Sequence, residues 1–279
     1  MNPCAPCCLL AAMLLCASAH AQSSLQRGAY LVNSIAACGS CHTPRDPGSP
    51  AGKPAGKRLA GGLQMTSPAF TAYSSNITPD PTTGIGRWTD AQIITAIRDG
   101  RRPDGSIIGP PMPIDAYRQM SDADVKAIVA YLRSVRPVRN AVPASLYRVP
   151  LPRSYGPPVR HVAAVSPRNR LAYGRYLATI GHCLECHTPM GPDRRRAYRT
   201  ELGAGSQVFE GAWGSSVSAD ITPRGLGHFS DSQLESIITT GVLPDGARLK
   251  PPMPFAYYAR MKPADLDALV AFLRTLPAR

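Results

Sequence analysis

The chain has 279 residues, of which 44% are hydrophobic and 18% charged, and its 31 Lys and Arg against 18 Asp and Glu give a formal net charge of +13. No apolar run reaches the roughly 20 residues that a transmembrane helix needs, and charged residues interrupt every later helical pattern, which argues against an integral membrane protein. The positive charge favours an acidic protein partner or peripheral contact with an anionic membrane, and a solvated basic surface explains it equally well.

Residues 1–21 have the features of a secretory signal peptide. An apolar run from Leu9 to Cys16 leads into Ala19-His20-Ala21, the small-x-small pattern that signal peptidase cleaves. We therefore expect cleavage after Ala21 and a periplasmic location for a soluble mature protein. A buried N-terminal helix is the alternative, because no Lys or Arg precedes the apolar run.

Two copies of the motif C-x-x-C-H contain every cysteine that remains after residues 1–21 are removed. The motif residues are Cys38, Cys41 and His42 in the first copy and Cys183, Cys186 and His187 in the second. This motif attaches c-type haem, because two thiols about one helical turn apart can add to the two vinyl groups of one porphyrin. The next histidine then lies under the iron as its proximal ligand. We predict two covalently bound haem c groups.

Three other uses of paired cysteines explain less of this pattern. A redox dithiol needs no histidine after the second cysteine and usually accompanies a βαβ pattern. A Cys4 zinc site normally has its two pairs within about 15–20 residues of each other, whereas nearly a whole domain separates them here. A disulfide between such close cysteines closes a small loop and adds little stability. None of the three accounts for His42 and His187.

The remaining sequence is a tandem repeat. The segment G-I-G-R-W-T-D at 84–90 recurs as G-L-G-H-F-S-D at 225–231, and P-P-M-P at 110–113 recurs at 251–254. A period of this length indicates a duplicated domain and not a solenoid of short repeats. Each domain therefore contains one haem motif.

Each repeat has the sequence signals of three helices. The haem motif lies on the first, and the second begins with a capping box, formed by Thr89 and Gln92 or by Ser230 and Gln233, and ends at a glycine. The third helix carries an apolar i, i+3, i+4, i+7 stripe, consisting of Val125, Ile128, Val129 and Leu132 or of Leu266, Leu269, Val270 and Leu273. In domains this small, the porphyrin can supply much of the core against which the stripe packs.

A proline-rich loop between the second and third helices holds the best candidates for the second axial ligand of the iron. Met112 and Met253 occupy equivalent positions, with prolines on both sides that stiffen the backbone. Met120 and Met261 also align with each other, although a place near the start of the third helix favours a packing role. Ligation by His and Met raises the reduction potential and fills both axial positions, which favours electron transfer over catalysis.

Three further histidines are weaker candidates for the iron. His161 lies in the linker, and His182 directly precedes Cys183, so it cannot readily reach the distal side of the same haem. His228 aligns with Arg87, and both precede an aromatic residue, which favours a polar or propionate-facing role.

A proline-rich linker, residues 136–167, separates domain 1 (22–135) from domain 2 (168–279). Its composition favours an extended, semi-rigid chain. Apolar side chains predict that part of it docks on a domain surface: Leu146, Tyr147, Val149 and Leu151. The loops after the haem motifs, at about 43–75 and 188–219, are rich in Gly, Pro and Ser and are expected to fold over the porphyrin edge.

Together these motifs resemble the dihaem and trihaem c-type cytochrome subunits of bacterial periplasmic dehydrogenases, such as the alcohol and gluconate dehydrogenases. The resemblance covers nearly the whole mature chain. Besides the haem motifs it rests on S-N-I-T-P-D at 75–80 and on the segments at 84–90 and 110–113, with weaker copies at 220–223 and 251–254. It implies an all-α fold of two tandem class I cytochrome c domains.

The resemblance also implies that the chain is an electron carrier and not itself an enzyme. The donor would be the catalytic subunit of a periplasmic dehydrogenase, and the acceptor an oxidase, a quinone or another cytochrome. Trp88 and Phe229 are expected near the porphyrin or its propionates, and nucleic acid is a poor partner for an exported haem protein. Two enzymatic alternatives are a dihaem peroxidase, which needs one open iron site, and a dihaem thiosulfate dehydrogenase, which typically uses a Cys ligand.

Overall fold

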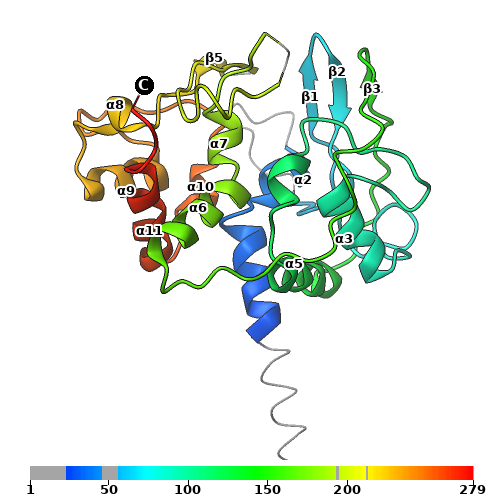
Figure 1. Cartoon of the computed structure of the whole chain (residues 1–279). Helices are drawn as coiled ribbons and strands as arrows, with labels where there is room; N and C mark the ends of the chain where they lie inside the picture. The colour runs from blue at the N-terminus through cyan, green and yellow to red at the C-terminus, as the bar shows by residue number, and fades with distance from the viewer. Residues whose placement is uncertain (1–22, 46–55, 193–194, 212, 279) are drawn as a thin grey trace, which may run out of the picture.

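The computed structural model describes residues 23–45, 56–192, 195–211 and 213–278 (Figure 1). The predicted signal peptide, residues 1–21, lies outside this part of the chain. Among the residues described, none of the helices combines the length and apolar character that crossing a membrane requires.

The chain is mostly helical, and its two repeats contain matching series of elements except for α8, which occurs only in the second (Figure 1). The first repeat comprises a helix over residues 23–33, α2 (Cys38–His42), β1 (Gln64–Ser67), β2 (Phe70–Tyr73), α3 (Asp90–Asp99), α4 (Ile114–Tyr117) and α5 (Asp122–Ser134). The second comprises α6 (Arg170–Ile180), α7 (Cys183–Cys186), β4 (Val208–Gly211), β5 (Gly214–Val217), α8 (Pro223–Leu226), α9 (Asp231–Thr240), α10 (Phe255–Tyr258) and α11 (Pro263–Leu273). A short strand, β3 (Leu146–Tyr147), lies in the linker.

The predicted capping boxes are confirmed at the start of α3 and of α9. The Thr89 hydroxyl accepts a hydrogen bond from the Gln92 backbone N–H at 3.2 Å, and the Gln92 side chain accepts one from the Thr89 N–H at 2.8 Å. Ser230 and Gln233 form the same pair. Reciprocal bonds of this kind satisfy N–H groups that the first turn of a helix leaves without a partner. Both helices end at a glycine with positive φ, as expected.

Two glycines allow the first and last helices of each repeat to cross closely. A β-carbon on Gly28 would lie 1.9 Å from the carbonyl oxygen of Ala127 in α5, and one on Gly174 in α6 would lie 1.9 Å from that of Ala268 in α11. No other residue fits at either crossing. Because each haem motif follows its glycine-bearing helix directly, the crossing also positions α2 and α7.

Two small antiparallel sheets add to the helical fold that the sequence predicted. The linker strand β3 pairs with β2 of the β1–β2 hairpin, with Phe70 opposite Tyr147. Strands β4 and β5 form a separate hairpin in the second repeat. Both hairpins lie in the loops that follow the haem motifs. The described parts of those loops thus contain regular structure that their Gly, Pro and Ser content did not indicate.

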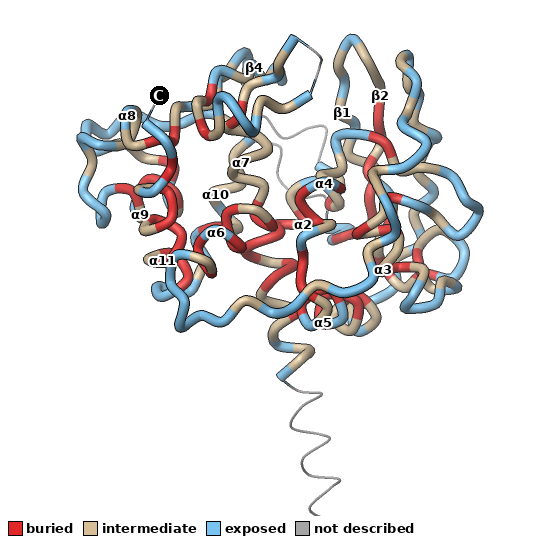
Figure 2. Tube along the Cα trace, viewed as in Figure 1, coloured by how far each residue is buried: buried red, intermediate tan, exposed pale blue. Residues whose placement is uncertain are grey.

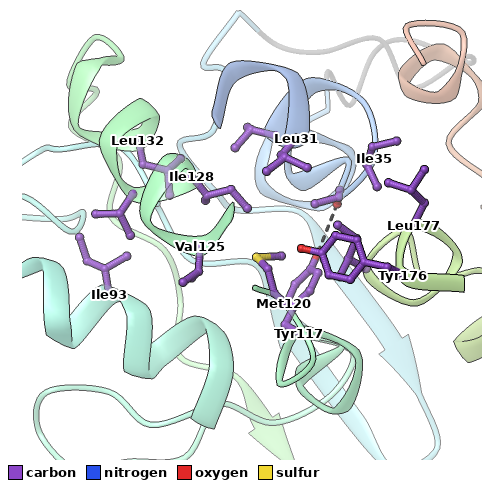
Figure 3. Close-up of a cluster of buried hydrophobic side chains, with 14 of the residues drawn as sticks. Leu31, Ile35, Ile93, Tyr117, Met120, Val125, Ile128, Leu132, Tyr176 and Leu177 are labelled. Carbon is purple, nitrogen blue, oxygen red and sulfur yellow. Dashed lines mark hydrogen bonds between the residues drawn. The ribbon is translucent and has the colours of Figure 1, made fainter. Parts of the chain in front are cut away.

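The apolar core continues from one repeat into the other. Leu31, Ile35 and Met120 of the first repeat belong to the same buried cluster as Tyr176 and Leu177 of α6 (Figure 3). Buried residues lie mainly on the inner helices, whereas many of the outer loops are exposed (Figure 2). The contact between the repeats is therefore a packed interface.

Candidate functional site

The four motif cysteines lie on two short helices that the chain enters in the same way. The residues before α2 and α7, Ala37 and His182, have left-handed backbones with φ of 44° and 59°. None of the four is paired in a disulfide within the described residues. Burial raises the pKa of Cys38 and Cys183 to about 12, so both thiols stay protonated at neutral pH. The first cysteine of each motif is thus partly buried, whereas Cys41 of the first motif is exposed.

The two motif histidines are oriented by backbone carbonyls at equivalent places. Nδ1 of His42 donates to the carbonyl of Ser75 at 2.7 Å, and Nδ1 of His187 donates to that of Ala219 at 2.8 Å. This tautomer leaves the Nε2 lone pair free for a metal. Burial also lowers the pKa of both imidazoles, which keeps them neutral, the form that binds iron.

The Ser75 carbonyl lies at the start of the segment 75–80, and the Ala219 carbonyl directly precedes the segment 220–223; the family resemblance rests on both segments. In the first repeat, Asn76 Oδ1 accepts bonds from the backbone N–H and the hydroxyl of Thr78, at 3.0 and 2.8 Å. Asp220 does the same for Thr222, at 2.9 and 2.6 Å. These side-chain turns fix the direction of the preceding carbonyl. The sequence singled out both segments, but their role in orienting histidine is visible only in the structure.

The second repeat contains an apolar pocket that brings together three of its four predicted haem residues, all except Cys186. Cys183, His187 and Met253 line it, and the remaining wall consists largely of Leu and Ile side chains: Ile35, Leu177, Ile221, Leu226, Leu234, Ile237, Ile238, Leu249, Leu269 and Leu273. An apolar wall with an oriented imidazole and a thioether fits a porphyrin and its iron. Met261 lines the same pocket, so the structure leaves two candidates, Met253 and Met261, for the distal ligand of this repeat.

The methionines of the first repeat occupy different environments. Met120 is completely buried in the core, and its carbonyl accepts a hydrogen bond from Arg98. Met112 is only partly buried and packs on the same apolar cluster as Cys38 and Trp88. Met120 thus packs in the apolar core, and Met112 stays the predicted ligand.

A pair of buried tyrosines joins the methionine loops to the haem helices, and sequence reasoning assigned them no role. The hydroxyl of Tyr117 lies 3.2 Å from the carbonyl oxygen of Ala36, and that of Tyr258 donates to the carbonyl of Gly181 at 2.6 Å. Both carbonyls directly precede the left-handed residue that leads into a haem helix. The sequence signal that could have identified them is their occurrence at equivalent positions of the two repeats.

The three weaker histidine candidates lie in different surroundings. His161 contacts Asp122 at 2.6 Å on the surface, and the exposed ring of His228 lies against Phe229. Nε2 of His182 is 2.7 Å from the Tyr117 hydroxyl, at the contact between the repeats. His182 thus joins the two haem helices through a tyrosine of the other repeat.

His182 should make stability depend on pH. Burial lowers its pKa from the ordinary 6.5 to about 4, so the unfolded chain binds the proton more readily than the folded one. Its contribution is complete above about pH 6.5 and is lost as the pH falls towards 4, by at most about 3 kcal/mol. Urea unfolding of the holoprotein between pH 8 and pH 4 measures this slope. The control is His182→Asn, which tolerates the left-handed backbone. Its slope should be smaller, and equal slopes would contradict the assignment.

Known proteins resemble the chain over most of its length. Residues 25–136 match the family model described as Cytochrome c. A fructose dehydrogenase cytochrome subunit from Gluconobacter japonicus is 35% identical over 94% of this chain and 54% of its own, and the cytochrome c subunit of an alcohol dehydrogenase (quinone) from Komagataeibacter europaeus is 32% identical over 96% and 59%. A "Diheme cytochrome c-type" protein from Cereibacter sphaeroides is 28% identical over 86% of this chain and 82% of its own.

The chain spans little more than half the length of the two dehydrogenase subunits. The match nevertheless includes both C-x-x-C-H motifs, since it covers nearly all of this sequence. The chain belongs to the cytochrome c family and is a relative of the cytochrome c subunits of bacterial dehydrogenases.

Proposed function

We propose that the chain is a periplasmic dihaem cytochrome c that relays electrons from the catalytic subunit of a dehydrogenase to a respiratory acceptor. The two haems would be anchored by the cysteines of α2 and α7, with His42 and His187 as proximal ligands and Met112 and Met253 as distal ligands. The fructose and alcohol dehydrogenase relatives are themselves named as cytochrome subunits, which supports a dehydrogenase as the donor.

The observation that carries this proposal is the pocket of the second repeat. His187 is held there in the tautomer that presents Nε2, and a methionine lines the same pocket. A bound haem c supplies the iron that changes oxidation state. The protein's own side chains would fill both axial positions and surround the ring with hydrocarbon, which leaves no iron site for a substrate.

The placement of the two haem helices supports a relay through both sites. The Tyr117 hydroxyl contacts the segment leading into α2 and also His182, which directly precedes α7. A β-carbon on Gly39 of α2 would lie 2.5 Å from the hydroxyl of Tyr257 in α10. One packed interface thus fixes both motifs relative to each other, an arrangement suited to passing an electron between two bound haems.

Intact mass and optical spectra of the exported protein test the proposal directly. In a host that attaches haem, we expect the mass of two haems and a near-infrared methionine-to-iron band for each. A reduced sample should pass its electrons to an oxidised cytochrome without consuming substrate. A high-spin or five-coordinate haem with peroxide or thiosulfate turnover would favour the enzymatic alternatives and overturn the carrier role.

A further inference from the structure

The linker lies across the methionine loop of the first repeat. We refer to residues 145–159 as the strap. At its start, the Ser145 hydroxyl accepts a hydrogen bond from the Tyr73 backbone N–H at 3.0 Å, and β3 pairs with β2. The expected docking of the linker is confirmed for Tyr147 and Leu151, whereas Leu146 is 58% exposed.

Two tyrosines of the strap bond to the loop that leads to Met112. The Tyr147 hydroxyl donates to the carbonyl of Pro110 at 3.0 Å, and the Tyr155 hydroxyl donates to that of Ile108 at 2.8 Å. A β-carbon on Gly109 would lie 2.5 Å from the Tyr147 ring, so glycine is required for this approach. The loop is thus held by hydrogen bonds at two carbonyls and by a close ring contact between them.

The far end of the strap is anchored to the first repeat by charged side chains. Asp99 accepts a hydrogen bond from the Val159 backbone N–H at 3.0 Å and forms an ion pair with Arg118, also at 3.0 Å. Arg118 in turn donates to the carbonyl of Pro157. Because Asp99 is the last residue of α3 and Arg118 directly follows α4, the strap is fixed on both sides of the methionine loop.

The corresponding loop of the second repeat is held differently. The carbonyl of Pro251, equivalent to that of Pro110, accepts its hydrogen bond from the Ser216 hydroxyl of β5 at 2.6 Å. Among the described residues, no tyrosine hydroxyl bonds to this loop. Leu249 and Lys250 are exposed, whereas Ile108 and Gly109 at the equivalent positions lie under the strap. The Lys250 ammonium also donates to the carbonyl of Ser215 at 3.2 Å, in an exposed contact. The loop that carries Met253 is therefore held partly by a contact on the surface, whereas the loop that carries Met112 lies under the strap.

We propose that Tyr147 and Tyr155 are positioning residues that make the two iron sites unequal. They hold the thioether of Met112 in place through its loop, so the second site is the one that exchanges its methionine for a small exogenous ligand, such as imidazole. This inference rests on the proposed ligation by Met112 and Met253. Ligand binding requires a methionine loop to move aside, and each hydrogen bond lost in that movement opposes binding.

Imidazole titration of the oxidised two-haem protein, followed by the near-infrared methionine-to-iron band, tests the inference. Wild-type protein should lose the band in two equal steps, separated by on the order of tenfold or more in imidazole concentration. The double variant Tyr147→Phe/Tyr155→Phe should move the later step about tenfold towards the earlier one. A β-carbon on Gly100 would lie 2.7 Å from the Tyr155 ring, as one on Gly109 would lie close to the Tyr147 ring. Phenylalanine keeps both rings in these places, so this variant should fold.

The matched control is Ser216→Ala, which removes the hydroxyl that holds the second loop and should lower the midpoint of the earlier step alone. A single step in the wild type, or midpoints unchanged by the double tyrosine variant, would overturn the role of the strap while leaving methionine ligation intact. A wild-type protein without the band would overturn the ligation itself and the inference with it.

Discussion

A variant with alanine in place of both Cys183 and Cys186 is expected to carry one covalent haem and to lose most of the stability of its second repeat. The pocket of that repeat is lined largely by Leu and Ile side chains, and without a porphyrin this surface has nothing apolar to pack on. The expected loss exceeds about 4 kcal/mol, more than most single substitutions cause. Intact mass measures haem content, and urea unfolding followed by far-ultraviolet circular dichroism measures stability.

The matched control is Cys38→Ala together with Cys41→Ala. It should also remove one haem but destabilise its repeat less, because that core contains fully buried side chains from both repeats that do not line the pocket, including Leu31, Met120 and Ile180. Two haem masses on either double variant would show that these cysteines are not the anchors. Equal losses of stability would contradict the unequal contribution of the porphyrin to the two cores.

Local signals were sufficient to predict the second and third helices of each repeat, because capping and periodicity depend on residues a few positions apart. Thr89 with Gln92 and Ser230 with Gln233 are pairs of this kind, and the structure has helices starting at both. Local signals did not predict the left-handed residues that separate α2 and α7 from the helices before them, or the one-turn helices α4, α8 and α10. The strands were missed because they are short and lie in Gly- and Ser-rich segments such as Gly214–Val217, where side-chain alternation is weak.

Features of the site that depend on main-chain atoms or distant pairings could not be predicted from the sequence. The acceptors for His42 and His187 are backbone carbonyls, which every residue has, so residue type carries no information about them. Tyr117 and His182 come from different repeats and meet only because the two cores are packed together. The docked strap was anticipated from its apolar side chains, but the carbonyls that Tyr147 and Tyr155 bind were not.

Met253→His is expected to lower the reduction potential of one haem by at least about 0.1 V, since axial ligands set haem potentials over a range of about 0.8 V. A thioether ligand gives a higher potential than a second imidazole, so the haem should change from a His/Met to a bis-His type. One of the two methionine-to-iron bands should disappear, and the other haem should keep its potential. A spectroelectrochemical titration measures both effects.

Met261→Leu is the control that decides between the two methionines of this pocket, because both line it. Leucine fills a similar volume without a ligating sulfur, so both bands and both potentials should persist if Met253 is the ligand. In the first repeat the corresponding pair of variants is Met112→His and Met120→Leu. Met120 is completely buried, so Met120→Leu changes a core side chain. If Met261→Leu removed a band and Met253→His did not, the distal ligand of the second haem would be Met261. The loop compared with the strap-covered Met112 loop would then carry no iron ligand. In that case the proposed difference in ligand exchange between the two iron sites would lose its basis.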